Sequence, residues 1–283
     1  MLAVVLALGA SASWGSADFI GGITSRRIGS ALAVTVLSEA VAMLAALVIL
    51  GVVRPDWPGP EFLFFAGIGG VFEAVAIAAL YRGFSIGAMG VVSPIAACSA
   101  IIPVVFGIAL GESLATLVAI GIPLALMGVI AVAWTPGAAG AAGGRLAGGV
   151  GVAIVAACGF GGFIVVIDEA VARSDVVWAV AVARFTLVLA AGVAALVVRP
   201  TYSGAREAAV PLAALGILDL TAVTLLAAAT EQGLLAVVGV LAALYPIVTL
   251  LLARFILGER LRVSQRVGTV IAFIGVALIA SAA

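Results

Sequence analysis

Ten apolar stretches, each long enough to cross a membrane, run through this chain between short connectors rich in proline, glycine and charge. A membrane-spanning helix needs about 20 mostly apolar residues. Hydrophobic residues make up 65% of the chain and charged residues only 9%, so too little polar surface exists to cover a soluble globule. The sequence therefore predicts an all-α integral membrane protein with ten transmembrane helices, at roughly 2–23, 31–52, 62–81, 86–109, 114–134, 148–167, 176–198, 210–229, 234–257 and 265–282.

Several residue types that common enzymes require are missing. The chain has no histidine, and all 13 basic residues are arginine, which excludes His-dependent triads and lysine-based phosphate loops or Schiff bases. Its two cysteines, Cys98 and Cys158, lie inside apolar runs, where neither a disulfide framework nor a metal site is supported. The net charge of zero, without a basic tract, argues against nucleic acid. We expect no enzyme activity, no catalytic residues, no cofactor and no metal.

The second half of the chain repeats the first. With an offset of 147 residues, 110–133 aligns with 257–280 with nine identities in 24 positions, among them the Leu-Gly-Glu steps that begin at Leu110 and Leu257. With an offset of 144, Trp14-Gly15 aligns with Cys158-Gly159. These matches predict a five-helix repeat at 1–134, a Gly/Ala-rich linker at 135–147 and a second repeat at 148–283.

Because five is an odd number, the second repeat must enter the membrane from the opposite side. Inverted repeats around a central cavity are the architecture of alternating-access transporters, which bind substrate at the repeat interface near mid-membrane. A scaffold or receptor of duplicated origin is the alternative. Scaffolds, however, have no need of charged residues at mid-depth.

Several motifs resemble the EamA domain of the drug/metabolite transporter superfamily. They are the duplicated Gly-Glu steps, the segment from Ser13 to Phe19, the stretch from Phe163 to Arg184-Phe185, and Leu244-Tyr245-Pro246, which precedes Glu259 by thirteen residues. The first repeat has Ala97-Cys98-Ser99 where the second has Leu244-Tyr245-Pro246, so the Tyr-Pro step is not symmetric. The resemblance implies a secondary carrier, usually an exporter of amino acids, metabolites or drugs.

Four charged residues lie at mid-depth in the predicted spans: Glu39, Glu73, Arg184 and Asp219. A charge at the bilayer centre is unfavourable by about 2.5–3.5 kcal/mol on insertion scales, so each is a candidate functional residue. Arg184 could pair with one carboxylate merely to hold helices together, but this leaves two carboxylates without a partner. Burial favours the protonated form of a carboxyl group, which suggests that Glu39, Glu73 or Asp219 couples transport to protons.

The same charges suggest the substrate class. One fixed cation and spare anions suit a zwitterion such as an amino acid, with its carboxylate at Arg184. Trp14, Phe19, Phe163 or Tyr245 would then line an apolar cavity wall. We therefore expect a multi-pass carrier of the cell inner membrane that exports small amphipathic metabolites. A hydrophobic cation could use the acids alone, as in a multidrug exporter, and an intramembrane enzyme is a more distant alternative.

Three further acids receive structural interpretations. Glu112 and Glu259 precede the fifth and tenth spans, where we expect them to cap the helix N-termini. Asp18 either pairs with Arg26 or Arg27 at the interface or faces the cavity.

The orientation stays open. Ten arginines lie in or beside odd-numbered connectors and two in even-numbered ones, which predicts external termini, whereas the resemblance implies cytoplasmic ones.

Overall fold

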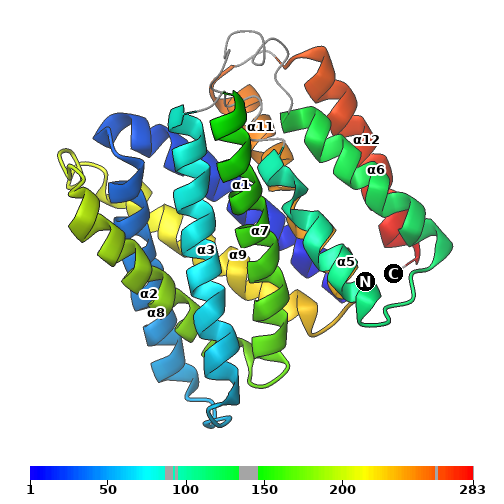
Figure 1. Cartoon of the computed structure of the whole chain (residues 1–283), viewed down its shortest axis with the longest axis horizontal. Coiled ribbons are helices and arrows are strands. Elements are labelled where there is room, and N and C mark those ends of the chain that lie inside the picture. The colour runs from blue at the N-terminus through cyan, green and yellow to red at the C-terminus, as the bar shows by residue number, and fades with distance from the viewer. Residues whose placement is uncertain (87–91, 93–94, 134–145, 259–260, 283) are drawn as a thin grey trace.

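The computed structural model describes residues 1–86, 92, 95–133, 146–258 and 261–282, and in this part the chain is all-helical, without strands (Figure 1). This confirms the predicted fold class at the level of secondary structure. The helices are α1 (Leu2–Ile28), α2 (Ala31–Val53), α3 (Glu61–Ile86), the 3-10 turn η1 (Cys98–Ala100), α5 (Ile101–Ala109), α6 (Thr116–Ala133), α7 (Leu146–Val171), α8 (Val176–Val198), α9 (Ala209–Thr230), α10 (Leu235–Ala242), α11 (Tyr245–Ile256) and α12 (Val263–Ala282).

Nine helical spans in the described residues are long and apolar enough to cross a membrane. The fourth predicted span, 86–109, is represented by a shorter apolar helix, Ile95–Ala109, because residues 87–91 and 93–94 lie outside the described part. The predicted linker lies outside it as well, up to residue 145, and α7 begins at Leu146.

Several boundaries differ from the sequence predictions: α1 and α3 extend past their predicted ends, residues 23 and 81, to Ile28 and Ile86. The ninth span is not continuous: α10 ends at Ala242 and α11 starts at Tyr245, where Pro246 occupies the first turn and lacks a backbone N–H. The sixth span continues past residue 167 to Val171 and so includes Asp168 and Glu169. Hydropathy marks the end of the apolar stretch, whereas a helix can continue beyond it while its backbone hydrogen bonds remain favourable.

The two halves use matching helix ends. Ser30 accepts a hydrogen bond from the backbone N–H of Ala33 at the start of α2, and Asp175 caps α8 in the same way through the N–H of Trp178. Both helices end in a left-handed arginine, Arg54 with φ 47° and Arg199 with φ 51°. Each cap recurs 145 residues later in the chain.

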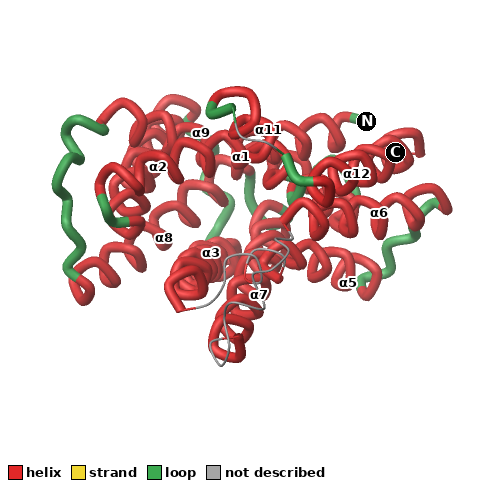
Figure 2. Tube along the Cα trace, turned by 90° about the horizontal axis from the view of Figure 1, so that it is seen from above, coloured by secondary structure: helices red, strands yellow, loops and turns green. Residues whose placement is uncertain are grey.

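The helices pack mainly as pairs that join the two halves. α6 lies along α12, α3 along α7 and α1 along α9, while α2 contacts both α8 and α9 (Figure 1). The view from above shows the chain ends close to each other (Figure 2). Large apolar side chains such as Leu196, Val197 and Phe255 point outward and are exposed, as a lipid-facing surface requires.

Glu112 does cap a helix, but not the one that the sequence predicts. Its Oε1 accepts a hydrogen bond from the backbone N–H of Leu235 at 2.6 Å, and its Oε2 one from Ala236 at 3.1 Å. These N–H groups belong to α10, whereas α6 begins only at Thr116. The sequence could not reveal this contact because it joins residues 123 positions apart. Glu259 lies outside the described residues.

Candidate functional site

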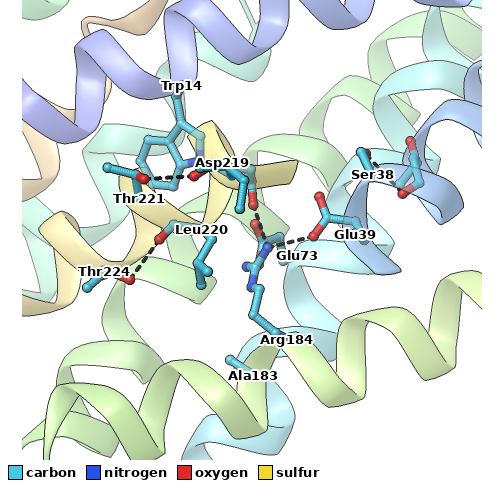
Figure 3. A network of polar contacts seen from close by, with 12 residues as sticks. Trp14, Ser38, Glu39, Glu73, Ala183, Arg184, Asp219, Leu220, Thr221 and Thr224 are labelled. Atoms are coloured by element: carbon cyan, nitrogen blue, oxygen red, sulfur yellow. Dashed lines mark hydrogen bonds and ion pairs between the residues drawn. The ribbon is translucent and has the colours of Figure 1, made fainter. Parts of the chain in front are cut away.

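Arg184 is fully buried, and its guanidinium lies among three carboxylates from three other helices (Figure 3). Its Nη1 donates to Oε2 of Glu39 on α2 at 2.9 Å and to Oδ2 of Asp219 on α9 at 2.6 Å. Its Nη2 donates to Oε2 of Glu73 on α3. The four charged residues singled out by their depth therefore form one cluster, which we call the seam cluster.

Two glycines bring the seam cluster together. A Cβ atom at Gly70 would collide with the carbonyl oxygen of Ala183, next to Arg184, and one at Gly216 would collide with that of Ser38, next to Glu39. Each glycine precedes an acid by three residues, Gly70 before Glu73 and Gly216 before Asp219, so glycine and acid share a helix face. Sequence reasoning missed Gly216, although the repeated Gly-x-x-acid spacing is a signal that could have found it.

The seam cluster is almost completely withdrawn from solvent. Arg184 has an exposed fraction of 0%, and Glu39 and Glu73 of 4% each. The side chain of Asp219 is 13% exposed, which makes it the most accessible of the three acids. Withdrawing an ion from water is unfavourable by several kcal/mol unless partners compensate it. One guanidinium cannot neutralise three carboxylates, so the fully ionised cluster has a formal charge of −2, which favours the binding of protons or a cation.

Trp14 extends the seam cluster toward α11. Its Nε1 donates to Oδ1 of Asp219 at 3.0 Å, and its ring meets that of Tyr245 edge to face, with 6.4 Å between centroids. Asp18 lies one turn further along α1 and is exposed. Within the described residues Asp18 forms no ion pair with Arg26 or Arg27. This arrangement leaves a carboxylate and two aromatic rings beside Asp219.

The two phenylalanines predicted to line a cavity wall do not join this group. Phe163 is buried in the hydrophobic core, where its ring packs against α3 beside Gly69. Phe19 is half-buried and lies five residues beyond Trp14, on a different face of α1. Their role in substrate binding stays a prediction. Among the described residues no group of three or more His, Cys, Asp or Glu side chains is arranged to hold a metal ion.

Residues 147–281 match the EamA-like transporter family. The match covers the second half of the chain, which is therefore similar to this family over that half. With nine helices in the described residues that are long and apolar enough to cross a membrane, the chain is a multi-pass membrane protein whose second half carries an EamA domain of the drug/metabolite transporter superfamily. No curated protein matches the sequence significantly.

The fold also occurs in solved structures, of which 28 chains match. One protein of known crystal structure matches 98% of this chain and 95% of its own length, with a TM-score of 0.77. The sequence identity is 18%, so the likeness concerns the fold alone.

Proposed function

We propose that this protein is a secondary active transporter that moves small amphipathic molecules through the seam cluster by alternating access. The observation that carries this proposal is the seam cluster itself: four ionisable residues, two from each half and three of them buried, meet midway along their helices. Charges at this depth are unfavourable for a protein that only needs to be stable. A binding path for charged cargo accounts for their presence at the junction of the halves.

The packing of α6 on α12 supports an inverted repeat. The two helices are equivalent under the 147-residue offset, which relates Gly121 to Gly268 and Gly128 to Gly275. A Cβ atom at Gly121 would lie 2.7 Å from the carbonyl oxygen of Gly275, and one at Gly128 would lie 2.6 Å from that of Gly268. The start of each helix thus meets the end of the other, so these equivalent helices run antiparallel, as inversion requires.

Other contacts between the halves also occur twice, with the roles of the first and second half interchanged. Gly15 of α1 faces the backbone of Tyr245 in the other half, and Gly161 of α7 faces that of Ser99, 146 residues earlier than Tyr245. The contacts of Gly70 with α8 and of Gly216 with α2 form another such pair. These environments relate α1 to α7 by an offset of 146, which fits the packing better than the offset of 144 that the Trp14-Gly15 alignment suggests.

The positions of the chain ends support ten crossings. Both ends lie near each other in two perpendicular views (Figures 1 and 2), which requires an even number of crossings. Nine long spans and the shorter helix Ile95–Ala109 provide such a number. The domain boundaries at 1–134 and 148–283 follow from this topology and remain part of the proposal.

We propose protons as the coupling ion. The excess of carboxylates over guanidinium in the seam cluster favours a protonated acid when no other cation is bound. Asp219 has the most exposed side chain of the three acids, so it is the member of the cluster that water or a cation reaches most easily. Loss of a proton from the cluster would strengthen the ion pairs of its acids with Arg184, which links the charge state of the cluster to the packing of α8 on α2, α3 and α9.

Two substrate classes remain candidates. An amino acid would need Arg184 for its carboxylate, but both Nη atoms of Arg184 already donate to protein carboxylates and the side chain is buried. A hydrophobic cation needs only acids and aromatic rings, and Asp219 lies beside Trp14 and Tyr245. This arrangement favours the cation as a second candidate beside the amino acid.

Counterflow in proteoliposomes tests the proposal. The wild-type protein should exchange labelled neutral amino acids or a labelled quaternary ammonium dye, and competition between the two identifies the class. At least one of Glu39→Gln, Glu73→Gln and Asp219→Asn should lose dependence on a proton gradient, whereas Glu61→Gln, at an exposed acid outside the cluster, should not. Three amide variants that couple like wild type would refute proton coupling. Appearance of a chemically altered product would instead favour the intramembrane enzyme.

The membrane and the orientation need a separate measurement. A reporter fused to the C-terminus, expressed in a bacterial cell, should locate the protein in the inner membrane. Its activity on one side of that membrane decides whether the arginine distribution or the family resemblance predicts the orientation correctly.

A further inference from the structure

Glu112 joins the two halves at the bundle end where α10 begins. It follows α5 in the first half, and its carboxylate accepts both the Leu235 and the Ala236 backbone N–H of α10 in the second half. These N–H groups are among the first of a helix and have no partner within it. A carboxylate at this position forms two charge-assisted hydrogen bonds and also complements the helix dipole.

The surroundings of this carboxylate are shaped to accommodate it. Gly107 leaves the space that Glu112 occupies, since a Cβ atom there would overlap the carboxylate. Gly111 adopts φ 95°, a left-handed turn that glycine allows and that turns the chain toward α10. One turn into α10, Gly239 packs directly on the ring of Pro103 in α5. Glu112 thus stands at the outer end of a tight contact between α5 and α10.

The two parts of the ninth span differ in how closely the bundle surrounds them. All eight residues of α10 are buried, whereas Ile247 is the only residue of α11 that is buried among its twelve. The bundle therefore surrounds the half of this span next to Glu112 on every side, whereas α11 lies nearer the surface of the bundle and presents Phe255 outward. Asp18 and Gly22, on the part of α1 that approaches α11, are both exposed.

We propose that Glu112 is a positioning residue of the transport cycle, which latches α10 to the first half and so stabilises the conformation closed at this end. The inference rests on the proposed alternating access. Opening at the α10 end must separate α10 from α5 and break both hydrogen bonds of Glu112. Weakening these bonds should therefore shift the population toward the conformation that opens at the α10 end and closes at the other.

Cysteine labelling measures this population at both ends. The native cysteines are removed as Cys98→Ala and Cys158→Ser. One reporter is Val240→Cys, buried in α10, and the other is Gly22→Cys, where an added Cβ atom meets nothing within 4 Å. A membrane-impermeant maleimide is applied to either side of proteoliposomes. In Glu112→Gln the rate at the first reporter should rise roughly tenfold and the rate at the second should fall, because a hydrogen bond to a charged group is worth about that factor in an equilibrium.

Matched variants separate a latch from a simple helix cap. Glu231→Gln removes a carboxylate at the same end, from an exposed residue just before α10, and should change neither rate. Glu112→Asp keeps the charge on a shorter side chain and should give labelling rates between those of wild type and Glu112→Gln. This variant still tests the proposal if Glu112→Gln does not fold. A rise at Val240→Cys without a fall at Gly22→Cys means local fraying and overturns the proposal. The proposal is also overturned if Glu112→Gln leaves both labelling rates unchanged, or if Glu231→Gln changes them as much as Glu112→Gln does.

Counterflow on the same samples keeps the two proposals distinct. If wild type transports but the labelling does not respond to Glu112, the latch is wrong and the transporter stands. If the labelling responds reciprocally but no cargo exchanges, the conformational latch exists and the transport function is wrong.

Discussion

The two halves of this protein share a frame but carry different charges. Helix caps, left-handed turns and close-approach glycines recur at offsets of 145 to 147 residues, as Gly70 and Gly216 illustrate. At the centre the correspondence ends, because Glu39 in the first half is matched by Arg184 in the second. Two glutamates at these positions would repel each other across the seam. Helix packing therefore follows the repeat, whereas the attraction within the seam cluster depends on the difference between the halves, a glutamate in one and an arginine in the other.

The largest expected effect comes from making the seam acidic in both halves. Arg184→Glu places four carboxylates together without a cation, and it should lower the free energy of unfolding by at least about 3–5 kcal/mol. Position 39 in the first half corresponds to position 184 in the second. Adding Glu39→Arg to the same chain should therefore restore most of the lost free energy of unfolding, because the new arginine approaches Asp219 and Glu73 from the other side. Unfolding in mixed micelles with increasing SDS measures both variants.

A control variant tests whether restoring the net charge is by itself enough to restore stability. Arg184→Glu with Glu61→Arg has the same net charge as the exchanged pair but places its arginine on an exposed surface. This control should remain destabilised. Equal recovery in the two double variants would mean that net charge, and not an arginine at position 39, restores the stability.

The next largest effect tests the equivalent glycine contacts of the two halves. Gly70→Ala and Gly216→Ala each force a Cβ atom against a backbone carbonyl of the other half, so each should destabilise by about 1–3 kcal/mol. The two losses should be similar, since the contacts are equivalent. Gly192→Ala in α8, where the added atom meets open space, is the control and should not destabilise. If Gly70→Ala lowers the free energy of unfolding and Gly216→Ala does not, the two contacts are not equivalent.

A smaller matched pair lies at the helix starts. Ser30→Ala and Asp175→Ala each remove an N-cap, of α2 and α8, and should each lower the unfolding free energy by about 1 kcal/mol. Thermal unfolding in detergent compares them with Ser16→Ala, whose hydroxyl donates to the Ala12 carbonyl within α1 and caps no helix. A strong effect of one cap alone would indicate that the two helices differ in how far their packing stabilises them.

Sequence reasoning reaches those features that depend on local composition. The spans follow from apolar length, and the depth of Glu39, Glu73, Arg184 and Asp219 follows from their distance to the span ends. The sequence also contains the repeat. What it lacks is register between helices: nothing local indicates that Gly216 meets Ser38, that Glu112 reaches α10, or that Phe163 turns into the core. Such contacts depend on how distant segments pack, which hydropathy does not encode.

The smallest effect concerns the aromatic residue beside Asp219. Trp14 of α1 aligns with Phe160 of α7 under the 146-residue offset, so Trp14→Phe makes the halves alike at this position. The change removes one hydrogen bond to Asp219, and such bonds inside membrane proteins average about 0.6 kcal/mol, so unfolding should barely change. Transport should respond more strongly, because Asp219 loses the donor that orients its Oδ1. We expect the apparent substrate affinity in counterflow to change severalfold, whereas Phe160→Trp should leave it unaltered. If Trp14→Phe transports with unchanged affinity, the asymmetry that matters at the seam is confined to the charges.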